Sequence, residues 1–164
     1  MQVDGCATMK RTERRSNCPI SLALETFGDT WSLLVMRDLM FKNKTTYTDF
    51  LRSEEGIATN ILASRLRHLE VSGLIQRQGS RRSAAYALTE KGLDLLPVVV
   101  EMIGWSARYD PRTAADKAFV RRLRTNRQGL LAELRAELRR TQGISGGRRN
   151  ASRTPAGPRR RRSA

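Results

Sequence analysis

The sequence predicts an α+β fold that is mostly helical and whose only sheet is small. Apolar residues recur at helical spacing through most of the chain up to about residue 142. Two short apolar runs, at residues 74–75 and 85–88, flank a loop of glycine, serine and arginine. Three helices followed by a hairpin form an α+β pattern, and the 164 residues suit one ordinary domain with an appended tail.

The stretch Gly56–Tyr86 is the centre of this prediction. Leu62, Leu66 and Leu69 follow one another at i, i+4 and i+7, which places them on one face of a helix. Gly73, after Ser72, suits a left-handed helix stop. The opposite face carries small or polar side chains that can approach the edges of DNA bases, namely Thr59, Asn60, Ala63, Ser64 and Arg67. We therefore expect a helix that enters the major groove.

Each side chain on that face has a predicted role. Asn60 is suited to pairing with adenine and Arg67 to guanine or phosphate. Ser64 is suited to bonding a base or a phosphate. Thr59 has two readings of equal weight, a groove contact and the N-cap of the helix. Arg65, nearer the core side, is expected in a structural ion pair, and His68 in packing or at the surface.

The hairpin is predicted to form a basic wing. Its strands begin at Leu74 and Ala85, and its loop is Gly79–Ser83. A short strand at Thr45–Tyr47 would make the sheet three-stranded. The wing arginines, which would contact phosphates or the minor groove, are Arg77, Arg81 and Arg82. The pattern is that of a winged helix-turn-helix, and simple solvation of these arginines is the alternative.

Capping residues predict where the flanking helices begin and end. A first helix is expected to begin at Cys18-Pro19 and to end at Gly28. Asp29 or Thr30 is expected to cap a second helix that reaches about Phe41. Thr48 or Asp49 is expected to start a short helix, and Thr89 to cap a long one that reaches about Tyr109. The apolar stripe of the long helix exceeds what one small domain covers, so we predict a homodimer. The alternative is that this helix folds back on the first one.

Charge is concentrated towards the C-terminus. Residues 113–164 hold 15 basic and 3 acidic side chains, which gives a net charge of +12. Residues 1–112 hold 16 basic and 13 acidic side chains, which gives a net charge of only +3. This distribution favours a polyanionic partner, with double-stranded DNA the leading one, and a merely solubilising tail is the alternative. Helical spacing over 113–141, interrupted near Asn126–Gly129, indicates helices that extend the dimer contact or order only on DNA.

The predicted organisation has four parts. Residues 1–17 form a flexible arm, 18–110 the DNA-binding and dimerisation domain, 111–142 a basic helical extension, and 143–164 a disordered arginine-rich tail. No run reaches the ~20 apolar residues of a membrane span and no signal peptide is recognised, so a cytoplasmic protein is expected. One histidine and two cysteines predict no zinc site, and no catalytic motif or cofactor-binding sequence is found.

An ordered series of short motifs resembles the HxlR-type winged helix-turn-helix regulators. The matching residues span about Cys18–Tyr109 and include Cys18-Pro19-Ile20, Trp31–Leu34, Arg37–Leu39, Phe50, Ile57, Leu62, Arg65-Leu66, Leu69-Glu70, Gly73–Ile75 and Tyr86–Gly92. The resemblance implies a dimeric bacterial transcription factor similar to MarR-type regulators, often a repressor. The short wing, which has Gly79 and arginines in place of the usual prolines, and the chain beyond Asp110 depart from the family pattern.

The resemblance also implies a sensor of oxidants or electrophiles at Cys18. A helix N-terminus favours a thiolate, the reactive form of cysteine. A buried, inert cysteine is the alternative. The sequence thus predicts a sequence-specific regulator, nucleoid-associated and responsive to oxidants, electrophiles or a small-molecule effector. A nonspecific architectural protein driven by the basic tail is the second candidate, and a small-molecule-binding accessory protein the third.

Overall fold

The computed structural model describes residues 15–79 and 84–144 of the chain. Most of the predicted N-terminal arm with Cys6, the wing-loop residues Arg81 and Arg82, and the tail from residue 145 lie outside these described residues. Within the described part, no helix is both long and apolar enough to cross a membrane.

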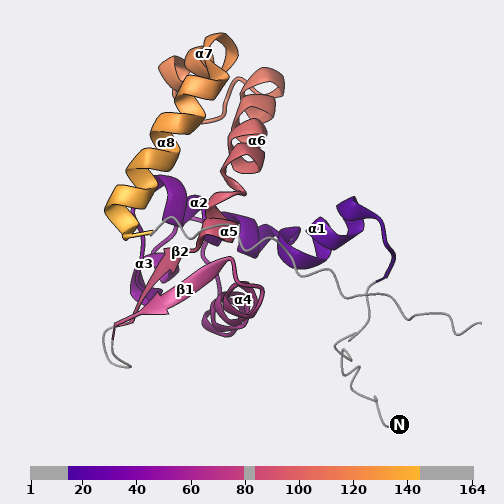
Figure 1. Ribbon diagram of the computed structural model, residues 1–164, viewed down its shortest axis with the longest axis vertical. Helices are drawn as coiled ribbons and strands as arrows, with labels where there is room; N and C mark the ends of the chain where they lie inside the picture. The colour runs from indigo at the N-terminus through magenta and orange to yellow at the C-terminus, as the bar shows by residue number, and fades with distance from the viewer. Residues whose placement is uncertain (1–14, 80–83, 145–164) are drawn as a thin grey trace, which may run out of the picture.

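The elements follow the predicted order of helices, hairpin and further helices (Figure 1). They are α1 (Pro19–Phe27), α2 (Thr30–Phe41), α3 (Tyr47–Leu51), α4 (Thr59–Val71), β1 (Ile75–Gln78), β2 (Ala85–Leu88), α5 (Glu90–Leu93), α6 (Leu96–Tyr109), α7 (Lys117–Thr125) and α8 (Arg127–Gln142). The predicted mostly helical α+β fold with a small sheet is confirmed.

The core forms where α2, α4 and the hairpin meet. Met36 and Leu39 of α2 are fully buried, as are Leu62 and Leu69 of α4. Gly73, at φ +69°, ends α4 as expected. The amide of Leu74 donates to the carbonyl of Leu69, and that of Gly73 to Glu70, which is the Schellman pattern. This stop turns the chain directly into β1 and fixes the hairpin beside α4.

The sheet is a two-stranded antiparallel hairpin with a partial third strand. Ile75 lies opposite Leu88 and Gln78 opposite Ala85. Thr46 forms an isolated bridge to Ala85, so the expected strand at 45–47 is reduced to one bridge. Tyr47 instead begins α3, because the Thr46 side chain and Asp49 form a reciprocal capping box. The predicted start of this helix at Thr48 or Asp49 is therefore wrong.

The expected long helix from Thr89 to Tyr109 is two helices. Thr89 does cap α5, accepting a hydrogen bond from the amide of Gly92. The break at Asp94–Leu95 has its cause in Pro97, which lacks an amide hydrogen and would clash with the carbonyl of Leu93 in a continuous helix. Proline is tolerated in the first turn of α6, so a new helix starts there.

The C-terminal extension is folded onto its own domain (Figure 1). Asn126 separates α7 from α8 as predicted, and its side chain caps α8. Gln142, at the end of α8, accepts a hydrogen bond from the amide of Leu88 and donates one to the carbonyl of Leu39. Ile144 is buried, so the fold extends two residues into the expected tail.

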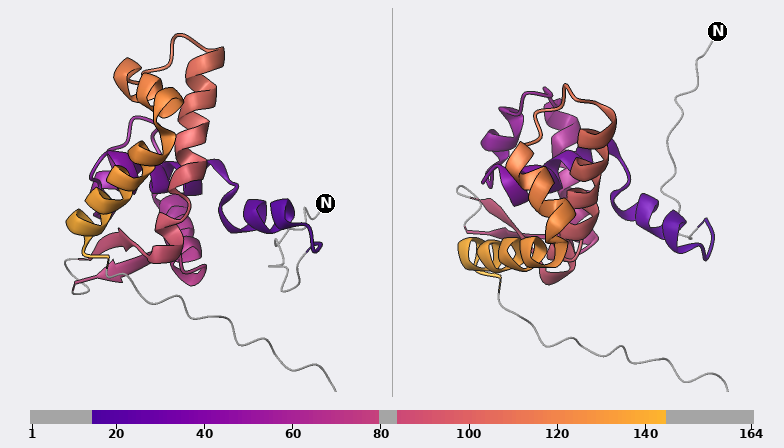
Figure 2. Two further views of the ribbon diagram at one scale, coloured as in Figure 1. Left: turned by 45° about the horizontal axis from the view of Figure 1, so that its top comes forward. Right: turned by 90° about the horizontal axis from the view of Figure 1, so that it is seen from above.

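Helix α1 differs from the other long helices because it buries no residue. Pro19 opens it and Gly28 ends it, as expected. Its apolar residues Ile20 and Leu24 are 69% and 62% exposed. In both views of Figure 2 this helix projects away from the body of the domain.

Helix α5 packs closely against Leu74, the residue before β1, and this contact yields a stability prediction. A Cβ added at Gly92 would overlap the backbone carbonyl of Leu74, which cannot move independently of β1. We expect Gly92→Ala to lower the free energy of unfolding by about 2 kcal/mol in urea titrations. Gly104→Ala is the control, because its Cβ would meet only the Leu123 side chain, at 2.8 Å, and alanine favours helix. Equal destabilisation by the two variants would contradict this account.

Candidate nucleic-acid interface

Helix α4 divides into a buried and an exposed face along its length. Leu62, Leu66 and Leu69 are at most 2% exposed. The five side chains predicted to face DNA are all exposed, and they form one continuous surface: Thr59, Asn60, Ala63, Ser64 and Arg67. The structure thus places all five side chains on the solvent-exposed side of α4, opposite its leucines.

The first turn of α4 corrects one expectation. The N-cap is Ala58, which makes no side-chain cap, and Thr59 is already the first helical residue. The Thr59 hydroxyl is therefore not the cap, and the helix begins one residue earlier than a cap at Thr59 would imply. The carbonyl of Thr59 accepts a hydrogen bond of 2.8 Å from the Tyr47 hydroxyl, which ties α3 to the start of α4.

Two side chains on the flanks of α4 hold it against the N-terminal helices. The Nε of Arg65 lies 3.5 Å from Oδ1 of Asp29, the residue that caps α2. The predicted structural ion pair of Arg65 is thus confirmed. His68 Nε2 lies 2.9 Å from the carbonyl oxygen of Thr26 in α1. Both residues therefore help to hold the helix rather than adding to its exposed face.

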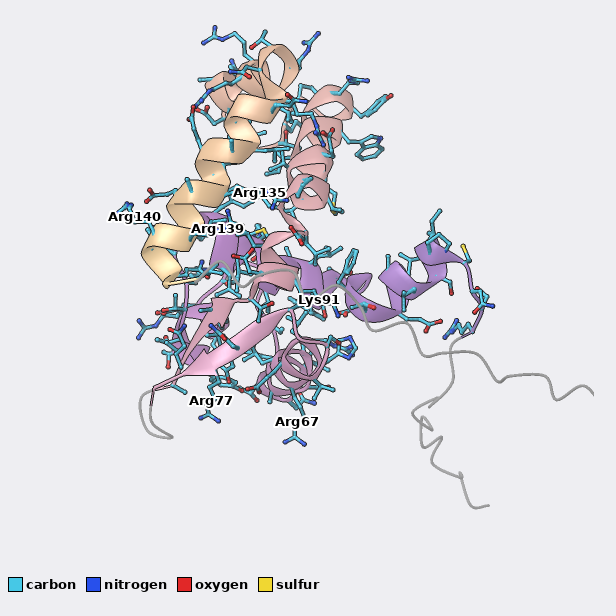
Figure 3. All side chains as sticks on the ribbon, viewed as in Figure 1. Arg67, Arg77, Lys91, Arg135, Arg139 and Arg140 are labelled. Atoms are coloured by element: carbon cyan, nitrogen blue, oxygen red, sulfur yellow. The ribbon has the colours of Figure 1, made fainter. Side chains whose placement is uncertain are left out.

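The described part of the hairpin adds one basic residue to the same side of the molecule. Arg77 is exposed on β1, opposite Tyr86 on β2. Figure 3 shows Arg67 and Arg77 pointing away from the body on the same side, one from α4 and one from the hairpin. The described part of the molecule thus carries these two cations on the same side, one on α4 and one on the hairpin.

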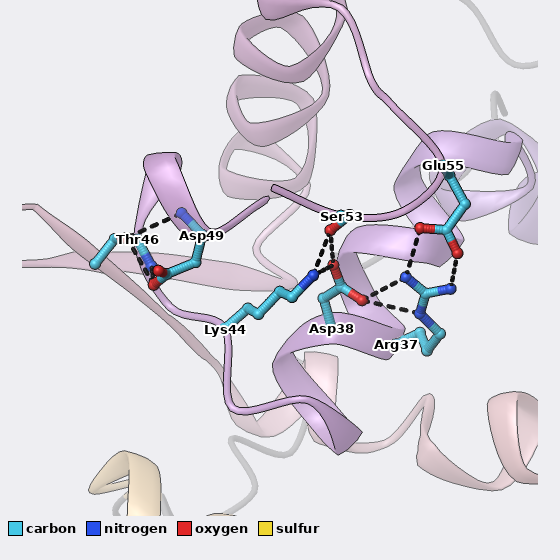
Figure 4. A network of polar contacts seen from close by, with 7 residues as sticks. All are labelled: Arg37, Asp38, Lys44, Thr46, Asp49, Ser53 and Glu55. Carbon is cyan, nitrogen blue, oxygen red and sulfur yellow. Dashed lines mark hydrogen bonds and ion pairs between the residues drawn. The ribbon is translucent and has the colours of Figure 1, made fainter. Parts of the chain in front are cut away.

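A polar network that the sequence reading missed fixes the loop before α4 (Figure 4). Arg37 donates to Asp38 and, through two nitrogens, to Glu55 in that loop. Asp38 is 2% exposed and accepts a 2.5 Å hydrogen bond from the Ser53 hydroxyl. Lys44 lies 3.6 Å from Asp38 and donates to Ser53. The adjacent residues Arg37 and Asp38 gave no periodic signal that would have revealed these contacts.

The network sets the charge states of its members. The hydrogen bond from Arg37 lowers the pKa of Glu55 to about 2, against the opposing effect of partial burial. The same contact, opposed by desolvation, raises the pKa of Arg37 above its ordinary value. Both groups are fully charged at neutral pH, so the pair holds the α4 entrance under physiological conditions.

A free thiol stands apart from this surface. Cys18 is the N-cap of α1 and is exposed. The alternative reading of a buried cysteine is therefore wrong for the chain as described. Among residues 15–79 and 84–144, no group of three or more potential metal-ligating side chains is found.

A helix with a buried leucine stripe, an exposed polar face and an adjoining basic hairpin defines a winged helix-turn-helix DNA-binding protein. The family model for the HxlR-like helix-turn-helix matches residues 26–114, more than half of the chain. The chain belongs to this family, and it is a transcriptional regulator with a helix-turn-helix domain. The match ends before α7, so α7 and α8 lie outside the family pattern.

Curated relatives and solved structures agree with this assignment. YdeP, an uncharacterized HTH-type transcriptional regulator of Bacillus subtilis (strain 168), is 30% identical over 98 residues, 58% of this chain and 76% of YdeP. PA1607, a proposed transcription factor of known crystal structure, is 34% identical with a TM-score of 0.55, over 62% of this chain and 72% of that one. The redox regulator HypR in its oxidized form is 28% identical with a TM-score of 0.52, over 57% of this chain and 98% of HypR.

The lowered pKa of Glu55 yields a pH prediction. Its stabilising effect is complete above pH 4.5, the ordinary value, and is lost as the pH falls towards 2. We expect Glu55→Gln to lower the free energy of unfolding by about 1 kcal/mol at neutral pH, the scale of a partly exposed ion pair. The difference from wild type should shrink in urea titrations near pH 3. A difference that is independent of pH would show that the carboxylate charge is not involved.

Proposed function

We propose that the protein is a sequence-specific transcriptional repressor that binds a pseudo-palindromic operator as a homodimer. The observation that carries the proposal is the exposed face of α4, from Thr59 to Arg67, held in place by three buried leucines and flanked by Arg77. Asn60 and Arg67 would read base edges in the major groove, with Thr59, Ala63 and Ser64 in close approach. Arg77, Arg81 and Arg82 of the wing would bind the DNA backbone or minor groove.

The dimer part of the proposal is supported by exposed apolar side chains on α6. Val98, Met102, Trp105 and Tyr109 are between 43% and 66% exposed. Trp105 and Tyr109 are in ring contact, with centroids 5.1 Å apart. Contiguous apolar surface of this kind marks an interaction site. Two copies related by a twofold axis would present their α4 helices about 34–36 Å apart, one turn of DNA.

The signal proposed for this regulator is an oxidant or electrophile acting at Cys18. The exposed thiol at the start of α1 is accessible to such reagents, and HypR, to which the chain is similar, is a redox regulator. Modification there would alter the position of α1. Because His68 of α4 contacts the α1 backbone at Thr26, such a change has a direct route to the DNA-reading helix.

The second candidate, a nonspecific architectural protein, rests on the basic C-terminal region. The arginines of α7 and α8 weaken it, because several of them are bound by acidic side chains of the same chain: Arg122 by Glu133, Arg127 by Glu101, Arg135 by Asp94, Arg139 by Glu90 and Arg140 by Glu137. Five of the eight basic side chains of residues 113–144 are thus paired within the chain, whereas the tail arginines on which this candidate was based lie outside the described residues. Selection of bound duplexes from a random library at near-physiological salt tests both candidates. One enriched palindromic motif supports the repressor, and no enrichment supports the architectural protein.

The α4 face yields a prediction for DNA binding. With the selected operator, Asn60→Ala and Arg67→Ala should each weaken binding by about 1–3 kcal/mol and relax the preference at one base pair. Arg140→Ala is the matched control, because it removes the same charge from α8, where Glu137 binds the guanidinium. Fluorescence anisotropy on the operator and on single-base variants measures both effects. Equal losses for Arg67→Ala and Arg140→Ala would exclude α4 as the reading helix.

The Cys18 proposal has its own test. We expect a mild oxidant or a quinone to release wild-type protein from the operator, while Cys18→Ser stays bound, because serine lacks the reactive thiol. Electrophoretic mobility shift, with and without a reductant added afterwards, measures the release. Cys6→Ser is the control for the second cysteine. If wild type and Cys18→Ser respond alike, Cys18 is not the sensor.

A further inference from the structure

The basic side chains of residues 113–144 divide into two groups. Five are paired with carboxylates, as described above, and the other three are Lys117, Arg121 and Arg124 of α7. These three are exposed, and no acidic side chain in the described part of the chain forms an ion pair with them. Residues 108–124 hold six basic and two acidic side chains, which gives a net charge of +4. Unbalanced positive charge is thus concentrated at α7.

The three cations form a single stripe along the helix, here called the α7 stripe. They recur at i, i+4 and i+7, so they share one face. The opposite face is anchored, because Leu123 is buried and Phe119 lines an apolar cavity of about 830 Å³ between α2 and α6. Phe119 also packs edge-on against Phe41, with ring centroids 6.3 Å apart. This anchoring fixes the rotation of α7 about its axis, so the stripe faces solvent.

A groove of about 660 Å³ adjoins the α7 stripe. All three cations line it, together with Pro111 and Thr113 of the α6–α7 connection, and none of the described residues that line it is acidic. Arg124 also lines a neighbouring hollow of about 580 Å³, where Arg108 of α6 adds a fourth exposed cation. A concave surface that carries one sign of charge concentrates oppositely charged groups near it. The groove therefore favours an anionic partner.

The α7 stripe is remote from the proposed DNA-reading face. Figure 1 shows α7 at one end of the long axis of the molecule, and α4 and the hairpin at the other end. Arg67 and Arg77 point away from the body at that far end (Figure 3). A straight duplex that lies along α4 therefore cannot also contact α7 of the same subunit. An anionic partner of the stripe must be a different molecule or a distant segment of the same one.

We propose that the α7 stripe binds the phosphate backbone of a second DNA segment, so that one protein molecule holds two duplex segments. The stripe spans seven residues of helix, about 10.5 Å. A duplex carries about six phosphate charges over that length of its axis, so each cation has a phosphate within reach. Such contacts hold the DNA without reading its sequence. The inference goes beyond operator binding by α4 and requires no particular dimer.

The composition of α7 favours DNA over an acidic protein as this partner. Protein interfaces are centred on buried apolar and aromatic anchors, and charged residues are depleted there. Helix α7, all of which the structure describes, exposes no large apolar side chain. Phosphate contacts need no such anchor, and a guanidinium binds a phosphate through two parallel hydrogen bonds. The helix also lies beyond residue 114, where the family match ends, so this surface is a feature of the extension.

Capture of a second duplex tests the proposal. Operator attached to beads is saturated with the full-length protein, and a labelled duplex of unrelated sequence is then added at several salt concentrations. We expect the triple variant Lys117→Gln, Arg121→Gln and Arg124→Gln to reduce capture at least about tenfold, because three phosphate contacts are lost. The slope of log affinity against log salt should become shallower by about 2.7, at 0.9 for each contact. Binding to the bead operator should stay within about twofold of wild type, because that duplex does not touch α7.

The matched control removes the same charge from α8. It combines Arg127→Gln, Arg135→Gln and Arg140→Gln, whose guanidinium groups are bound by carboxylates, and it should capture the second duplex as wild type does. Circular dichroism verifies that both triple variants fold. Equal capture by the two variants, or no capture by wild type, would overturn the proposal and leave operator binding by α4 standing. Binding of labelled polyglutamate but not of the second duplex would also overturn it, in favour of an acidic protein partner.

Discussion

Burial of one leucine stripe governs the arrangement of this domain. Leu62, Leu66 and Leu69 are removed from water against α2 and the hairpin, and this fixes the rotation of α4 about its axis. Once that rotation is set, Asn60 and Arg67 on the reverse side must face solvent. The same burial brings β1 beside the helix through the turn at Gly73. The exposed face and the wing are thus two consequences of a single packing event.

Polar contacts fix the position of α4 along its axis, which the buried leucines leave open. Burial alone would allow α4 to slide along its axis, whereas the Arg37–Glu55 pair and the Tyr47–Thr59 hydrogen bond fix its first turn. Asp38 is a buried carboxylate, and burial of a charge is unfavourable unless the charge is paired. Arg37, Lys44 and Ser53 all contact it and offset this penalty. Side-chain hydrogen bonds and ion pairs thus hold the loop that leads into α4.

The C-terminal extension joins parts of the molecule with different roles. Gln142 links β2 to the end of α2, and Arg139 binds Glu90 on α5, where this hydrogen bond lowers the pKa of Glu90. At the other end of the extension, Phe119 lines the cavity beside α6. A segment outside the family pattern thus contacts both the hairpin and the helix proposed for dimerisation. Its basic composition, read alone, favoured nucleic acid, but the arginines named above are engaged within the chain.

The sequence by itself determined the elements whose signals are local. Leucine spacing, the Gly73 stop, the Thr89 cap and the Pro19 start each act within a few residues, so α4, the hairpin and the exposed α4 face were predicted. The start of α3 was misplaced because Thr46, Thr48 and Asp49 can all cap a helix. The cap at Thr59 was wrong because the N-cap position is held by Ala58, whose side chain cannot signal a cap. Only the tertiary structure decided the Arg37–Glu55 pair, the anchoring of Gln142 and the exposure of α1. Those outcomes depend on which distant segments meet, and no local pattern carries that information.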